Sequence, residues 1–194
     1  MVNYLLPAVL LIQFILIASG LLFSMRKWDI SARSGIYRFI AYIMALFALA
    51  GIIIIAYFPF PVQQEEIALN IEQQLGQTNN FVPFRSILGY AKEFCAGYES
   101  VLLFQCIGNI VLFLPYGFFV SIINWKRKKQ KRTVFFICFF TSLSIELMQG
   151  MFNLLLGYCY RSVDVDDLIL NIFGGMLGSV LADFIYKSWF SKSK

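Results

Sequence analysis

The sequence of 194 residues contains no histidine, and only 14% of its residues are charged. The lack of histidine excludes a Ser-His-Asp triad, an HExxH zinc helix and other histidine-dependent chemistry. Four cysteines are present, without a CxxC pair and without the spacing of a disulfide framework. Among them, Cys95 and Cys159 could form a disulfide, because both lie in segments that we place outside the membrane. We predict no cofactor, and no hydrolase or transferase signature points to an enzyme.

Polar residues are too few to coat a soluble domain. The chain is 59% hydrophobic and contains 21 phenylalanines, a composition that indicates a polytopic, all-α transmembrane bundle. Its net charge of +5 comes from basic residues clustered beside apolar runs. Loops that stay in the cytoplasm have this pattern, so we expect membrane lipids as partners and no nucleic acid.

Five apolar runs are long enough to cross a hydrocarbon core, for which about 20 helical residues suffice. We predict spans at 5–23, 39–58, 101–124, 133–148 and 168–186, the fourth being short unless it continues to residue 156. Apolar residues at Ile67, Ile71 and Leu75 predict a short amphipathic helix between the second and third spans. Residues 79–94, interrupted by Pro83, are too few to cross and predict a re-entrant or interfacial segment.

The chain thus divides into two N-terminal spans (1–61), an extracytoplasmic amphipathic and re-entrant segment (62–98) and a three-span core (99–194). Thirteen of the sixteen lysines and arginines fall on one side of these spans. The positive-inside rule places that side in the cytoplasm, with the N-terminus outside and the C-terminus inside.

Polar side chains occupy the outer third of the last three spans, where apolar residues would be expected. Such groups are costly in hydrocarbon and usually face a partner helix or a wet cavity. Their similar depth predicts one polar pocket open to the outer leaflet or to the extracytoplasmic water. The candidate pocket residues are Arg85, Asn109, Ser142, Glu146, Gln149, Arg161, Asp164, Asp167 and Asn171.

The last span combines this polar outer end with glycines further along the helix. Asp167, Asn171, Gly175 and Gly178 recur at helical spacing and share one face. Its glycines should let another helix approach closely.

Two interpretations of the polar cluster remain open. Glu146 could form a structural ion pair with Arg161, or the same groups could bind a polar ligand or a lipid headgroup. Asp164, Asp166 and Asp167 are typical of a solvated helix start, where acids are favoured by the helix dipole. Alternatively, they could hold a divalent cation together with Glu146, since hard cations take oxygen ligands.

Four segments in this order resemble the VanZ-like family of bacterial membrane proteins over about residues 81–181. They are NNFVPFRSI, GNIVLFLPYGFF, SLSIELMQ and RSVDVDDLILNIFGGMLG. The family positions correspond here to Asn109, Phe113, Pro115, Gly117, Glu146, Gln149, Arg161, Asp164, Asp167, Asn171, Gly175 and Gly178. The resemblance implies a multi-pass protein of the bacterial cytoplasmic membrane that acts at the cell envelope, in a family linked to teicoplanin susceptibility.

Three functions fit these features. The first is binding of an amphiphile, such as a lipoglycopeptide antibiotic or a lipid-linked wall precursor, in the outer pocket. The second is a transporter or flippase for a lipid-linked molecule. The third is a metal-dependent membrane enzyme that uses Glu146 and the aspartates.

Overall fold

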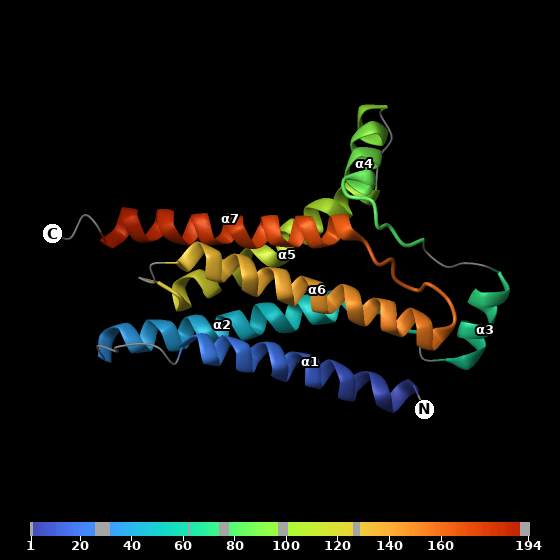
Figure 1. Ribbon diagram of the computed structural model, residues 1–194, viewed down its shortest axis with the longest axis horizontal. Coiled ribbons are helices and arrows are strands. Elements are labelled where there is room, and N and C mark those ends of the chain that lie inside the picture. The colour runs from blue at the N-terminus through green and yellow to red at the C-terminus, as the bar shows by residue number, and fades with distance from the viewer. Residues whose placement is uncertain are drawn as a thin grey trace.

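The computed structural model describes residues 2–25, 32–61, 63–73, 78–96, 101–125 and 129–190, and its elements there are helices (Figure 1). The predicted all-α class is therefore confirmed. The helices are α1 (Val2–Met25), α2 (Ala32–Tyr57), α3 (Gln64–Glu72), α4 (Arg85–Cys95), α5 (Val101–Ile123), α6 (Gln130–Leu156) and α7 (Val165–Phe190).

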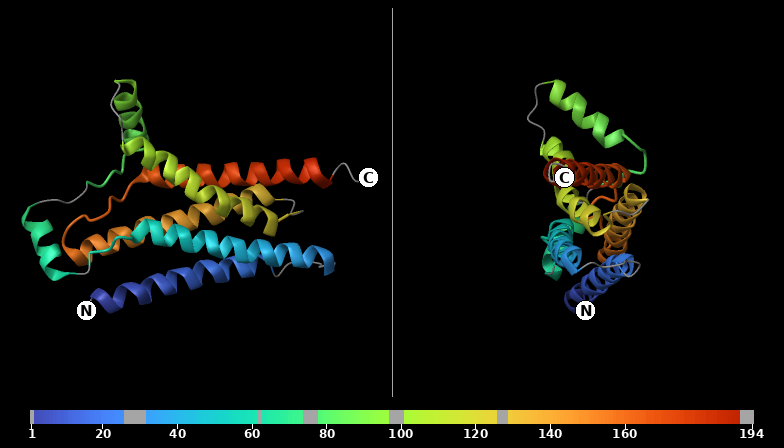
Figure 2. Two further views of the ribbon diagram at one scale, coloured as in Figure 1. Left: turned by 180° about the vertical axis from the view of Figure 1, so that it is seen from behind. Right: turned by 90° about the vertical axis from the view of Figure 1, so that its left-hand side faces the viewer.

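Helices α1, α2, α5, α6 and α7 run alongside one another as a bundle, while α3 and α4 lie at one end of it (Figure 2). Within the described ranges, four helices are long and apolar enough to cross a membrane. They are Gly35–Tyr57, Gln105–Ile123, Gln130–Leu156 and Val165–Ile185. The apolar part found in α1, Pro7–Leu22, is shorter, so a fifth span stays a prediction. Helix α6 does continue to Leu156.

The ends of α1, α5 and α7 and the starts of α2 and α6 meet at one end of the bundle (Figure 1). We call this the basic end, because Lys129, Lys131 and Arg132 lie there. The opposite end, with α3 and α4, is called the acidic end, after the aspartates at the start of α7. Lys126 to Lys128 and residues 191–194 lie outside the described residues, and the orientation across the membrane stays a prediction.

Glycines bring α5 and α7 into backbone contact. A Cβ atom added to Gly117 would collide with the backbone of Gly175, and one added to Gly178 would collide with the carbonyl of Leu114. The same holds for Gly174, whose Cβ would meet the backbone of Ile110. The close helix approach predicted for α7 is thus confirmed, and its partner is α5.

A buried glutamine joins α1 to the rest of the bundle. The Gln13 amide donates to Ser144 Oγ on α6 at 3.0 Å, and the Tyr57 hydroxyl of α2 donates back to Gln13 Oε1 at 3.0 Å. These bonds satisfy a polar side chain within an apolar helix, where an unpaired amide would be costly.

The segment before α5 lies outside the bundle. Helix α4 stands across the long axis of the other helices, and none of its residues is buried (Figure 1). This arrangement fits the interfacial alternative better than the re-entrant one. The predicted amphipathic helix is α3. Its Asn70 amide donates a hydrogen bond to the hydroxyl of Tyr158, in the loop after α6, at 3.3 Å, while Leu75 lies outside the described residues.

Substituting Gly117→Ala should destabilise the bundle by about 1–3 kcal/mol, because the added methyl overpacks a backbone contact. Thermal unfolding in detergent micelles measures the loss as a lower Tm. Gly108→Ala is the matched control on the same helix, since a Cβ there meets nothing within 4 Å. Equal Tm values for the two variants would contradict the α5–α7 contact.

Candidate functional site

The loop before α4 is joined to the start of α7 at the acidic end. The Asn80 amide donates to the Val163 carbonyl at 2.9 Å, and the Val165 amide donates to the Asn80 carbonyl at 3.0 Å. These two bonds form an isolated parallel bridge between Asn80 and Asp164. Residues that are more than eighty positions apart in the sequence are thereby fixed side by side.

Asp166 is fully buried and accepts backbone hydrogen bonds from the start of α4. Its carboxylate receives the amides of Phe84 at 2.5 Å, Ser86 at 2.8 Å and Ile87 at 3.3 Å. The first amides of a helix lack partners within the helix, and the helix dipole favours negative charge beside them. Asp166 therefore caps α4 from a distant helix, and its bond to Phe84 supports the left-handed φ of 65° at that residue.

Asp164 connects the same two segments through side chains. It accepts from the Asn80 amide at 2.8 Å and from the Ser86 hydroxyl at 2.6 Å. It also accepts from the backbone amide of Asp166 at 2.8 Å. We call Asn80, Ser86, Asp164 and Asp166 the α4 clasp. Every member has a partner, as buried polar groups require.

Glu146 extends this network into α6. It is 7% exposed, and its Oε2 accepts the backbone amide of Asp164 at 2.9 Å. The ion pair with Arg161 proposed as an alternative does not form, since the Arg161 guanidinium instead donates to the Phe58 carbonyl at 2.8 Å. A backbone N–H at the start of α7 thus takes the place of the expected cation.

Two further pairs join α7 to its neighbours. The Asn109 amide donates to Asp167 Oδ1 at 2.6 Å, and both residues are half-buried. The Asn171 amide donates to Ser142 Oγ at 2.9 Å. Asn171 Oδ1 is buried and has no hydrogen-bond partner among the described residues, so an unsatisfied acceptor lies between α6 and α7.

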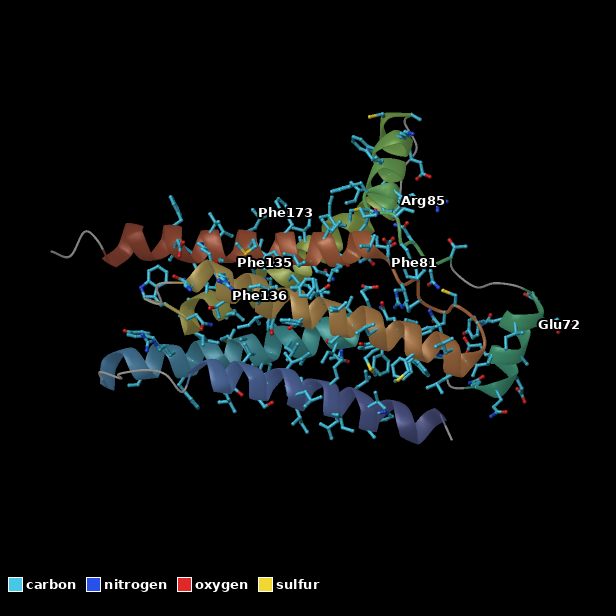
Figure 3. All side chains as sticks on the ribbon, in the orientation of Figure 1. Glu72, Phe81, Arg85, Phe135, Phe136 and Phe173 are labelled. Carbon is cyan, nitrogen blue, oxygen red and sulfur yellow. The ribbon has the colours of Figure 1, made fainter. Side chains whose placement is uncertain are left out.

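The remaining candidates lie at the margin of the cluster. The Gln149 amide donates to the Ala56 carbonyl at 3.1 Å, which with the Arg161 bond holds the end of α2. Arg85 is exposed at the start of α4 and is directed away from the bundle in Figure 3. The structure therefore joins Asn109 to Asp167, Ser142 to Asn171 and Glu146 to Asp164, whereas Gln149 and Arg161 bond to the end of α2 and Arg85 is exposed.

Two chemical alternatives receive no geometric support. Within the described ranges, no group of three or more cysteine, aspartate or glutamate side chains is placed to hold a metal ion. The carboxylates that could have held a cation accept hydrogen bonds from amide groups instead. Cys95 and Cys159 are both free thiols, so the disulfide does not form.

Outside the spans, burial changes the acidity of two tyrosines at the acidic end. Burial raises the pKa of Tyr160 to about 12. The pKa of Tyr90 on α4 is also raised, first by burial and further by the nearby Asp164 and Asp167. Both hydroxyls stay protonated at neutral pH and can act as hydrogen-bond donors.

A comparison with protein families gave a match over most of the chain. The VanZ/LLP1 family model matches residues 39–186. The chain belongs to the VanZ/LLP1 family. Searches of curated proteins and of solved structures gave no significant match.

The predicted family resemblance is confirmed, and the match is longer than the predicted one because it also covers residues 39–57 of α2 and the segment that follows. In this VanZ/LLP1 protein α2 takes part in the acidic end through the Ala56 and Phe58 carbonyls. The sequence analysis did not single out Asn80, Ser86 or Asn153. Asn153 accepts the Tyr160 amide at 3.1 Å and donates to the Arg161 carbonyl at 2.7 Å, shaping the loop before α7.

Substituting Asp166→Asn should release α4 from α7, because an amide retains only one acceptor for three N–H donors. A hydrogen bond to a charged group contributes about 1.5–3 kcal/mol, so amide exchange at the start of α4 should accelerate roughly 10- to 100-fold. Hydrogen–deuterium exchange mass spectrometry of peptides covering 84–90 measures this. The exposed Glu66→Gln on α3 is the control for the charge change, and exchange that is equally slow in both variants would refute the capping role.

Proposed function

We propose that this VanZ/LLP1 protein acts at the envelope face of the bacterial cytoplasmic membrane, where the acidic end binds an amphiphilic ligand of the lipoglycopeptide kind. The observation that carries the proposal is the meeting of polar side chains from α5, α6 and α7 in an otherwise apolar bundle. Asn109–Asp167 forms its half-buried margin, and Asn171 Oδ1 is an acceptor left unsatisfied within it.

The charge of this end favours a ligand that donates hydrogen bonds. Carboxyl groups of Glu146, Asp164, Asp166 and Asp167 lie close together, while Arg161 is engaged by a backbone carbonyl. A peptide-based headgroup supplies N–H and O–H donors to such acceptors. The pyrophosphate of a lipid-linked wall precursor would be repelled by them and would depend on the exposed Arg85 and Lys92 of α4.

An apolar surface beside these acceptors suits the acyl chain of an amphiphile. Phe81, Val82, Phe84 and Leu88 are all more than half exposed on and before α4. Helix α4 lies across the bundle (Figure 1), and we therefore expect this surface to run along the interface of the bilayer rather than through it. A ligand there would place its chain in lipid and its headgroup over the Asn109–Asp167 pair.

The middle of the bundle does not favour a transport path. Phe113, Tyr116, Val120, Val134 and Cys138 are fully buried there and pack against one another. A translocated headgroup needs polar partners along its route, and these side chains offer few. The described core therefore supports binding at one face better than transfer across it.

Binding of teicoplanin to the purified protein in nanodiscs tests the proposal. Asp167→Asn should weaken binding about tenfold or more, because a charge-assisted hydrogen bond is replaced by a neutral one. Asp183→Asn removes the same charge at the basic end and should leave affinity unchanged. A lipid-linked wall precursor is titrated in parallel to compare the two ligand classes.

Absence of saturable teicoplanin binding, or equal affinities in all three proteins, would overturn the proposal. If the precursor bound more tightly and lost this affinity on substituting Arg85→Gln, the ligand would be a lipid-linked precursor and the acidic end would remain the binding face. In a susceptibility assay, Glu146→Leu or Asn171→Leu should impair function more than any substitution in the first two helices.

A further inference from the structure

The side of the bundle between α1 and α6 is hollowed near the basic end. The cavity measures about 560 Å³, which is within the range of about 300–1,000 Å³ for ligand sites. Its lining comprises Leu16, Ile17, Gly20, Leu21, Lys129, Arg132, Thr133, Phe136, Ile137, Phe140 and Thr141. We call it the α1–α6 groove. A Cβ added at Gly20 would meet nothing within 4 Å, which agrees with open space along that helix.

The groove has the length of one bilayer leaflet. Its lining runs from Lys129, the residue before α6, to Thr141 on α6, a distance of about 18 Å at 1.5 Å per residue. A hydrocarbon core is about 30 Å thick, so the groove extends from its edge to near its centre. It stops close to the level where Gln13 of α1 bonds to Ser144 of α6.

Cations stand at the surface end of the groove. Lys129 and Arg132 are both exposed, and the Arg132 guanidinium lies over the Phe136 ring, 5.6 Å from its centroid. The ring of Phe136 belongs to the part of α6 near the basic end in Figure 3. The apolar α1–α6 groove thus ends at two positive charges.

These two cations differ from their neighbour Lys131. Lys131 forms an ion pair with Asp183 at 2.6 Å and donates to the Ser179 carbonyl at 2.9 Å. That pair is the one ion pair found in the described part of the chain. Lys129 and Arg132 therefore keep their charge available for an anion from outside the protein.

We propose that the α1–α6 groove binds an anionic phospholipid, with one acyl chain along the apolar lining and the phosphate between Lys129 and Arg132. Basic residues at a membrane surface attract anionic lipids, and a chain between α1 and α6 would replace side-chain contacts that these helices lack there. The site lies at the opposite end of the bundle from the proposed ligand face and does not depend on it.

Native mass spectrometry of the delipidated full chain, titrated with phosphatidylglycerol or phosphatidylcholine of identical chains, tests the site. Phosphatidylglycerol should bind more tightly. The double variant Lys129→Gln, Arg132→Gln should lose roughly 25-fold in phosphatidylglycerol affinity, about fivefold for each charge, and little in phosphatidylcholine affinity. Lys92→Gln on α4 is the control for a lost charge at the other end and should change neither affinity.

A second set of experiments tests whether the acyl chain lies in the groove, independently of the effect of charge. Gly20→Leu should lower phosphatidylglycerol affinity without altering a charge, and inorganic phosphate should not displace the lipid. A phosphatidylglycerol with a photoactivatable acyl chain should cross-link to residues 16–21 and 133–141 of the unaltered protein. Equal affinity for the two lipids, displacement by phosphate, or cross-links confined to other helices would overturn the proposal.

Discussion

Buried carboxyl groups at the start of α7 need hydrogen-bond donors, and this need determines how the acidic end is built. A buried acid without partners is costly in free energy. Asp166 takes its donors from the backbone at the start of α4, Asp164 from Asn80 and Ser86, and Glu146 from the Asp164 amide. Because these bonds link the loop before α4, the start of α4 and α6 to the start of α7, satisfying the acids fixes those segments against α7.

The glycines of α7 make this arrangement possible. Gly174 and Gly178 allow the backbones of α5 and α7 to touch, which a side chain at either position would prevent. At that separation the short Asn109 amide reaches the Asp167 carboxyl at 2.6 Å. A wider spacing of the two helices would leave both groups unpaired in an apolar setting. The glycines and the polar residues of α7 therefore act together, because the glycines set the distance between the helices that the polar hydrogen bonds require.

Hydropathy and depth alone could predict the class of fold and the meeting of Asn109, Glu146 and Asn171, because residues at one level of adjacent spans face a common interior. Their partners could not be predicted this way. The donor for Glu146 is a backbone N–H, which leaves no sign in a sequence. Asn80 lies in a loop without periodicity, so nothing marked it as half of the bridge to Asp164. An ion pair of Arg161 with Glu146 was one of two interpretations, but Arg161 donates to the Phe58 carbonyl beside the end of α2.

The two ends of the bundle have surfaces of opposite character, and this contrast bears on both proposals. Acceptors dominate at the acidic end, where the available cations are exposed on α4, whereas Lys129 and Arg132 at the basic end have no acidic partner among the described residues. In both proposals a membrane ligand meets one end of the bundle with its headgroup, and the charge of that headgroup decides which end. In the two proposals, anionic lipid is attracted to the groove, whereas the acidic end offers Asn171 Oδ1, an acceptor without a partner among the described residues, to a headgroup that donates hydrogen bonds. Under the two proposals, the opposite charges of the two ends of the bundle separate two classes of amphiphile.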